Sequence, residues 1–187
     1  MHHAKEEDPP PAQTDVPADD AAAAEAAAGL GQAIDMDRSF EALAENNALM
    51  FDLALPAAAL IGWTLAVLLV MVCIRVGRAR RDPSVLPYYG VYDGENPGSR
   101  TLKRIERQFA NLLEVPLLFY ALIALALILG IADGVFVVLA WVFVGLRILH
   151  SIWHIAVNSV PIRGLIWGLA TIVLIWMWVR VMGLIIF

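Results

Sequence analysis

The chain contains 187 residues, of which 60% are hydrophobic, and its mean hydropathy is +0.70. This composition excludes an ordinary soluble globular domain and is typical of a membrane protein. The formal charge of −5 is unevenly distributed, because residues 1–49 carry 2 Lys/Arg and 11 Asp/Glu residues, whereas residues 50–187 carry 11 and 7. We therefore expect a lipid bilayer, and no nucleic acid, as a partner of the chain.

Residues 1–49 are rich in alanine, proline and acidic side chains, and the three prolines at 9–11 oppose regular structure. The run from Asp19 to Ala28 could form a short alanine-rich helix, but it has no apolar stripe to bury. We therefore predict a disordered acidic tail over residues 1–49. It is interpreted as a solubilising extension rather than a docking segment.

Residues 50–187 contain four apolar stretches that predict membrane-spanning helices. The first, Leu53–Ile74, has 22 residues without a charge, and about 20 suffice to cross a bilayer core. The other helices are expected at 101–131, at 135–157 and from 162 to the end of the chain. Proline and glycine predict a loop over residues 82–100. These elements predict an all-α integral membrane domain, folded as an antiparallel four-helix bundle.

Positive residues gather around the first link between the expected helices. They are Arg75, Arg78, Arg80, Arg81, Arg100, Lys103, Arg104 and Arg107, whereas the turn at 130–134 has none. By the positive-inside rule, the first and third links should be cytoplasmic, with both termini on the opposite side. We expect this multi-pass protein in a bacterial inner membrane.

Two polar strings interrupt the second and third apolar helices. They consist of Arg107, Asn111 and Glu114 on the second helix and of Arg147, His150 and His154 on the third. Each string occupies one helix face by its spacing. A charged side chain near the bilayer centre costs roughly 2.5–3.5 kcal/mol on insertion scales, so such residues usually face a partner, a cavity or a ligand.

Counting residues from the helix ends places Glu114 level with Arg147, with Arg163 at the mouth of the cavity between the strings. Three arginines against one carboxylate favour an anion. An anion with carboxylates fits best, because a guanidinium group can bind a carboxylate through two parallel hydrogen bonds. An arginine near a thiol would also favour its reactive thiolate. The alternatives are that Arg107 and Arg163 mark membrane interfaces, and that Arg147 and Glu114 form a purely structural ion pair.

A metal site is a further alternative, because His150 and His154 lie one helical turn apart and Glu114 could add a ligand. The neighbouring arginines oppose a bound cation, so we predict no metal. Arg180, far along the last helix, is expected to extend toward the membrane interface, and Asp133 to be solvated.

Taken together, these residues resemble the MAPEG family, the membrane-associated proteins of eicosanoid and glutathione metabolism. The likeness covers about residues 50–187 and rests on the string from Arg107 to Pro116, on Arg147-Ile-Leu-His150 and on Pro161-Ile-Arg163. The resemblance implies a homotrimer with glutathione between neighbouring subunits near the cytoplasmic face. It implies that glutathione is held by Arg107, Asn111, Glu114, Arg147, His150 and Ser151, with His154 in the same site, and that Arg163 stabilises its thiolate.

The chain departs from the family's prostaglandin synthase at three positions. His154 and Trp167 stand where that enzyme has tyrosines, and Gly164 stands where it has a serine. The hydroxyl next to the catalytic arginine is therefore missing, which argues against isomerase chemistry. From the resemblance we expect a glutathione transferase or peroxidase that acts on apolar electrophiles, with Arg163 as the catalytic residue. The alternatives are a non-catalytic scaffold or accessory subunit of a larger membrane complex, and a lipid- or quinone-binding module that uses the same cavity.

Overall fold

The computed structural model describes residues 18–131 and 133–186, and within these ranges it contains five α-helices, one 3-10 helix and no strand. The elements are α1 (Ala18–Arg81), η1 (Pro83–Val85), α2 (Leu86–Val91), α3 (Arg100–Leu129), α4 (Gly134–Ala156) and α5 (Val160–Ile186). Four helices are long and apolar enough to cross a membrane: α1 from Gly29 onward, α3, α4 and α5. The all-α prediction and the four predicted spans are confirmed, and the protein is an integral membrane protein.

The chain divides into two compact units, residues 1–44 and 45–187. In the first unit, the residues from Ala18 onward are helical, and α1 continues without a break into the second unit. This corrects the expectation of disorder for residues 18–49, whereas residues 1–17 lie outside the described part of the chain. Alanine has the highest helix propensity, and extension of an existing helix avoids the cost of nucleation.

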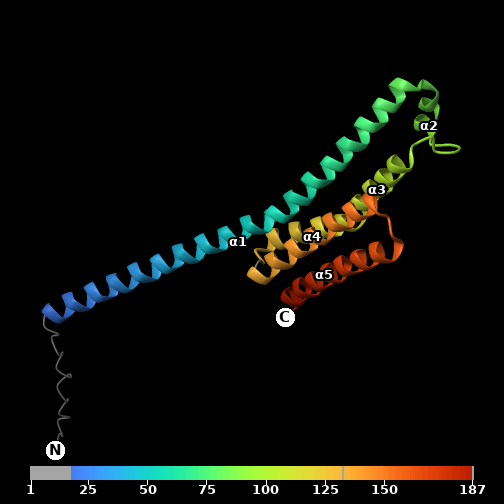
Figure 1. The fold of residues 1–187 in the computed structure, drawn as a ribbon. Helices are drawn as coiled ribbons and strands as arrows, with labels where there is room; N and C mark the ends of the chain where they lie inside the picture. The colour runs from blue at the N-terminus through green and yellow to red at the C-terminus, as the bar shows by residue number, and fades with distance from the viewer. Residues whose placement is uncertain (1–17, 132, 187) are drawn as a thin grey trace, which may run out of the picture. The chain divides into compact units, whose positions relative to one another are not determined.

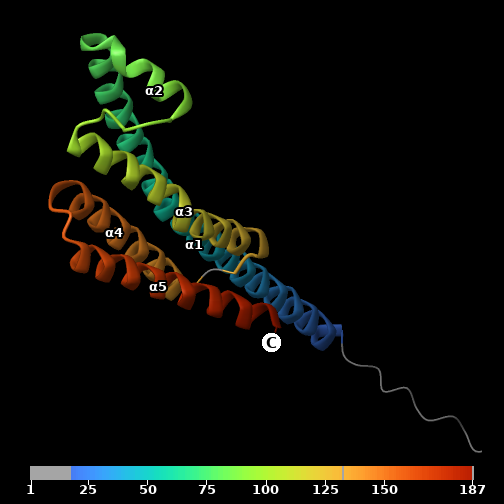
Figure 2. The ribbon, with the colours of Figure 1, turned by 90° about the vertical axis from the view of Figure 1, so that its right-hand side faces the viewer.

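The second unit holds the apolar core of the membrane domain. Along α1, the buried side chains are Leu53, Leu60, Val67 and Met71, which recur at a heptad-like spacing. Helices α4 and α5 lie side by side, and α3 contacts both (Figures 1 and 2). Phe119 of α3 stacks on Phe143 of α4, with ring centroids 4.5 Å apart.

The links between helices are shaped by local capping. Asp133 caps α4 by accepting a hydrogen bond of 2.6 Å from the backbone N–H of Phe136, and Gly130 ends α3 with a φ of +65°. The segment 82–100, expected to be a loop, instead includes η1 and α2 before Ser99 caps α3.

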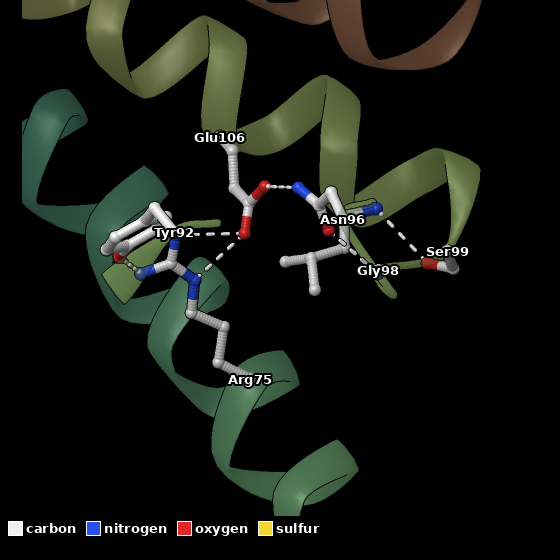
Figure 3. A network of polar contacts seen from close by, with 7 residues as sticks. Arg75, Tyr92, Asn96, Gly98, Ser99 and Glu106 are labelled. Atoms are coloured by element: carbon white, nitrogen blue, oxygen red, sulfur yellow. Dashed lines mark hydrogen bonds and ion pairs between the residues drawn. The ribbon is translucent and has the colours of Figure 1, made fainter. Parts of the chain in front are cut away.

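A polar network ties the end of α1 to the start of α3 (Figure 3). Arg75 donates from Nε to Glu106 at 2.9 Å and from Nη1 to the Tyr92 hydroxyl at 3.1 Å. Asn96 donates to the second carboxylate oxygen of Glu106 at 2.8 Å. The network fixes the irregular segment between α2 and α3 against α1 and α3.

At the other end of the membrane domain, Arg180 of α5 forms an ion pair with Asp133. This corrects the expectation that Arg180 extends alone toward the interface and that Asp133 is simply solvated. The carboxylate therefore has two roles, since its other oxygen caps α4.

Candidate functional site

The site begins with a fully buried polar contact between α3 and α4. Gln108 donates from Nε2 to the Ser151 hydroxyl at 2.6 Å, and Ser151 donates to the backbone oxygen of Arg147 at 2.9 Å. Gln108 and Ser151 are both 0% exposed. Ser151 therefore lies behind the cavity rather than on its wall. Sequence reasoning missed Gln108, although a glutamine directly after Arg107 in an apolar helix was a usable signal.

Arg147 is also fully buried, and its partner is Asn111 rather than Glu114. Its Nη2 donates to the backbone oxygen of Asn111 at 2.8 Å and to the side-chain oxygen at 3.1 Å. Within the described residues, the ion pairs are Arg75–Glu106 and Arg180–Asp133, so the expected pair of Glu114 and Arg147 is not formed. Glu114 is exposed on this chain.

The reason for this change of partner is the rotation of α3. Glu114 lies three positions after Asn111, so its side chain is turned by about 60° around the helix axis from that of Asn111. The depth count therefore named the two facing helices correctly but paired Arg147 with the wrong residue of α3. Two further nitrogens of Arg147, Nε and Nη1, are buried without a hydrogen-bond partner in this chain. Buried donors normally find an acceptor, so these atoms fit a ligand or a second subunit.

In front of this buried layer, α3, α4 and α5 enclose an open cavity of about 220 Å³. It is lined by Arg107, Asn111, His150, His154, Val160, Arg163, Gly164 and Trp167. Five of the eight predicted site residues thus line one cavity, while Arg147 and Ser151 lie behind it and Glu114 does not line it. Sequence reasoning did not predict that Val160, Gly164 and Trp167 form the remaining wall.

The bend between α4 and α5 positions the catalytic candidate, Arg163. Asn158 has a φ of +60°, and its side-chain oxygen accepts a hydrogen bond of 2.6 Å from Nη1 of Arg163. Asparagine is among the few residues that tolerate this backbone conformation, because its short polar side chain can bond locally. Arg104 donates to the last carbonyls of α4, at 3.3 and 3.4 Å, and stabilises the same bend.

His150 is linked to Arg163 through the backbone. Its Nδ1 lies 3.2 Å from the carbonyl oxygen of Arg163. A carbonyl oxygen can only accept, so we assign the proton to Nδ1, which leaves Nε2 as the acceptor of the neutral ring. The histidine therefore both fixes the start of α5 and offers one free ring nitrogen.

The charge of the cavity wall determines what it can bind. The wall has two guanidinium groups, two imidazoles and an amide, and no carboxylate. Such a set favours an anion with several acceptor oxygens. In the described part of the chain, no group of three or more His, Cys, Asp or Glu residues lies close enough to hold a metal ion.

Comparison with known proteins agrees with these features. A sequence model described as the MAPEG family matches residues 53–183, which is well over half of the chain and includes every residue of the cavity wall. No curated protein and no solved structure matches the chain. The resemblance stated from the polar strings is thereby confirmed, and the chain belongs to the MAPEG family.

Proposed function

We propose that this MAPEG protein binds glutathione in the cavity lined by Arg107 and Arg163 and transfers it to, or uses it to reduce, apolar electrophiles. The observation that carries the proposal is the composition of the cavity wall, which combines two arginines with two histidines and contains no carboxylate. Glutathione presents two carboxylates and a thiol, so paired guanidinium contacts would bind it and orient it.

The proposed chemistry depends on Arg163. A guanidinium beside the thiol lowers the energy of the thiolate, which is the nucleophilic form. In the transferase reaction, the thiol proton leaves to water, the sulfur forms a bond to an electrophilic carbon, and that carbon releases its leaving group. In the peroxidase reaction, two glutathiones are oxidised to a disulfide while a hydroperoxide is reduced to an alcohol and water. The bond from Arg163 to Asn158 would hold the guanidinium in place.

The proposal includes a homotrimer of antiparallel four-helix bundles, with glutathione between neighbouring subunits. Glu114 supports this assembly, because it is exposed on an apolar helix, where lipid disfavours a carboxylate. A neighbouring subunit would remove Glu114 from lipid. We further propose that the cavity opens near the cytoplasmic face of a bacterial inner membrane, with both termini on the other side.

The test is calorimetric titration of glutathione into the purified full chain. We expect saturable binding to the wild type and weaker binding in Arg163→Ala and in Arg107→Gln. Arg180→Gln is a matched control, because it removes the same charge from α5 beside Asp133, away from the cavity. Wild-type protein that binds no glutathione, or equal loss in the control, would contradict the proposal.

A second function is supported by the absence of a hydroxyl group from the cavity wall. Without serine, threonine or tyrosine among its lining residues, the wall has no neutral hydroxyl donor for isomerase chemistry. This favours, as the alternative, a non-catalytic scaffold or accessory subunit of a larger membrane complex. Stable co-purification with such a complex, together with an empty cavity, would select this alternative.

A further inference from the structure

One face of α1 lines two more cavities, and neither shares a residue with the cavity of Arg107 and Arg163. The face consists of Trp63, Val67, Val70, Ile74, Gly77 and Arg81, which recur at steps of four and three residues. Such steps keep side chains on one helix face. The face is apolar over most of its length and becomes cationic at its end.

The cationic end is a cavity of about 540 Å³ between the last turns of α1 and the N-cap of α3. Its polar lining consists of Arg78, Arg81, Asp82 and Ser99. The Nε atom of Arg78 is buried and has no hydrogen-bond partner in the chain. A buried guanidinium donor without an acceptor indicates that an anion completes this cavity.

Asp82 is the one acidic residue of this wall, and one of its two oxygens is already engaged. Oδ1 of Asp82 accepts hydrogen bonds from the Ser84 hydroxyl at 2.5 Å and from the Ser84 backbone N–H at 3.2 Å. These bonds, with the hydroxyl contributing most, hold the pKa of Asp82 below its usual value, so the carboxylate stays charged near neutral pH. Two arginines and one carboxylate leave the wall with one net positive charge.

The apolar end of the same face is a cavity of about 230 Å³. It is lined only by apolar side chains and one indole: Trp63, Ala66, Val67 and Val70 of α1, Ile105 of α3 and Ile155 of α4. From Val70 to Arg78 the helix rises about 12 Å, which is close to the roughly 15 Å depth of one leaflet's hydrocarbon. The two cavities therefore have the spacing of a lipid headgroup and its acyl chain.

We propose that this face of α1 is a binding site for one anionic phospholipid. The phosphate lies between Arg78 and Arg81, and one acyl chain follows Ile74 and Val70 to the cavity beside Trp63. The single net charge of the headgroup cavity matches a lipid with one net negative charge, and it discriminates against zwitterionic lipids. The apolar continuation of the face favours a lipid over a free phosphate ion.

The test uses native mass spectrometry of the delipidated full chain, titrated with phosphatidylglycerol or with phosphatidylcholine of the same acyl chains. We expect tighter retention of phosphatidylglycerol, and a loss of about thirtyfold in Arg78→Gln/Arg81→Gln, since each basic residue near a membrane surface contributes about fivefold. Arg80→Gln is the matched control, because Arg80 is one residue away and does not line the cavity. Loss of a similar size per charge in Arg80→Gln, or equal retention of both lipids, would overturn the proposal.

A second pair of measurements separates a lipid from a free phosphate. We expect sn-glycerol 3-phosphate in millimolar excess to leave the bound phosphatidylglycerol in place, and Val70→Trp to weaken long-chain lipids more than short-chain ones. Displacement by glycerol phosphate, or equal weakening of both chain lengths, would show an anion site without a chain groove. Melting temperatures of all variants, measured without lipid, identify any that fail to fold. If Val70→Trp fails to fold, the smaller change Val70→Phe is used in its place.

Discussion

The membrane domain contains two cavities that each carry two arginines, yet the rest of their walls differ. Beside Arg107 and Arg163 stand two histidines and an amide, so several sides of a bound molecule could meet a polar group. Beside Arg78 and Arg81 the helix face continues into apolar side chains. A pair of guanidiniums therefore selects an anion, and the neighbouring residues decide whether that anion is a small polar molecule or a lipid.

The two cavities also differ in how their arginines are held. Arg163 is fixed by Asn158 at the bend between α4 and α5, and the cavity behind it is closed by the buried contact of Gln108 with Ser151. Arg78 lies at the end of a helix, next to the irregular segment that includes η1 and α2. A rigid arginine suits the activation of one atom, whereas a peripheral one suits a headgroup of variable structure.

The largest expected effect that separates the two cavities is on turnover. Arg163→Ala should lower the rate of glutathione conjugation to a model apolar electrophile by roughly 10²–10³-fold. This is the effect expected when an enzyme loses one preorganised hydrogen-bond donor to an anion in its active site. Arg78→Gln/Arg81→Gln should leave that rate within twofold of the wild type, measured in the same detergent. A similar loss in both variants would show that the cavities do not have separate roles.

A smaller effect is expected on glutathione affinity in Arg107→Gln. A hydrogen bond to a charged group contributes about 1.5–3 kcal/mol, so the dissociation constant should rise roughly 10- to 150-fold. Calorimetry gives the constant, and retention of phosphatidylglycerol in the same preparation should not change. An unchanged glutathione constant would remove Arg107 from the site and leave only its position at the interface.

The buried contact of Gln108 with Ser151, behind the cavity of Arg107 and Arg163, can be tested by measuring stability alone. Ser151→Ala leaves Nε2 of the buried Gln108 without its acceptor and should lower the free energy of unfolding by about 1–3 kcal/mol. The double variant Gln108→Leu/Ser151→Ala should recover much of that loss, because the amide of Gln108 is then no longer buried without a partner. The free energies of unfolding of the wild type, the two single variants and the double variant are measured in mixed micelles. If the effects of the two single variants simply add up in the double variant, the contact contributes little.

The smallest effect is expected at Asp82, and its sign is opposite to that of the arginines. Asp82→Asn keeps an oxygen for the Ser84 bonds but removes a negative charge, so retention of phosphatidylglycerol should rise about fivefold. In the wild type, retention should rise as the pH falls below the ordinary carboxyl pKa of 3.8 and through the lowered pKa of Asp82. The Asn variant should lack that rise, and a rise in both would assign it to another group.

The same carboxylate also makes a prediction about the segment after α1. Because the folded state lowers the pKa of Asp82, its bonds to Ser84 stabilise η1 above pH 3.8 and are lost as the pH falls through the lowered value. Hydrogen exchange at the Ser84 amide should therefore accelerate at low pH in the wild type. If the exchange rate of the Ser84 amide, corrected for the intrinsic pH dependence of exchange, does not change with pH, this assignment is wrong.

The sequence alone determined the four membrane spans and most of the polar residues of the cavity of Arg107 and Arg163. Apolar length defined the four spans, and helical spacing identified four residues of the cavity wall, because both depend on the geometry of single helices. Spacing places side chains on a face of their own helix, and it says nothing about how that helix is rotated against its neighbours. For that reason the sequence paired Arg147 with Glu114, whereas the structure pairs it with Asn111.

Only the tertiary structure decided the contacts between elements. Packing of α3 on α4 joined Gln108 to Ser151, and the meeting of α5 with the start of α4 joined Arg180 to Asp133. The helical state of residues 18–49, by contrast, has a local origin, because alanine-rich sequence extends α1. In both polar contacts the two groups lie far apart along the chain, so the contacts become visible only when the helices are placed side by side.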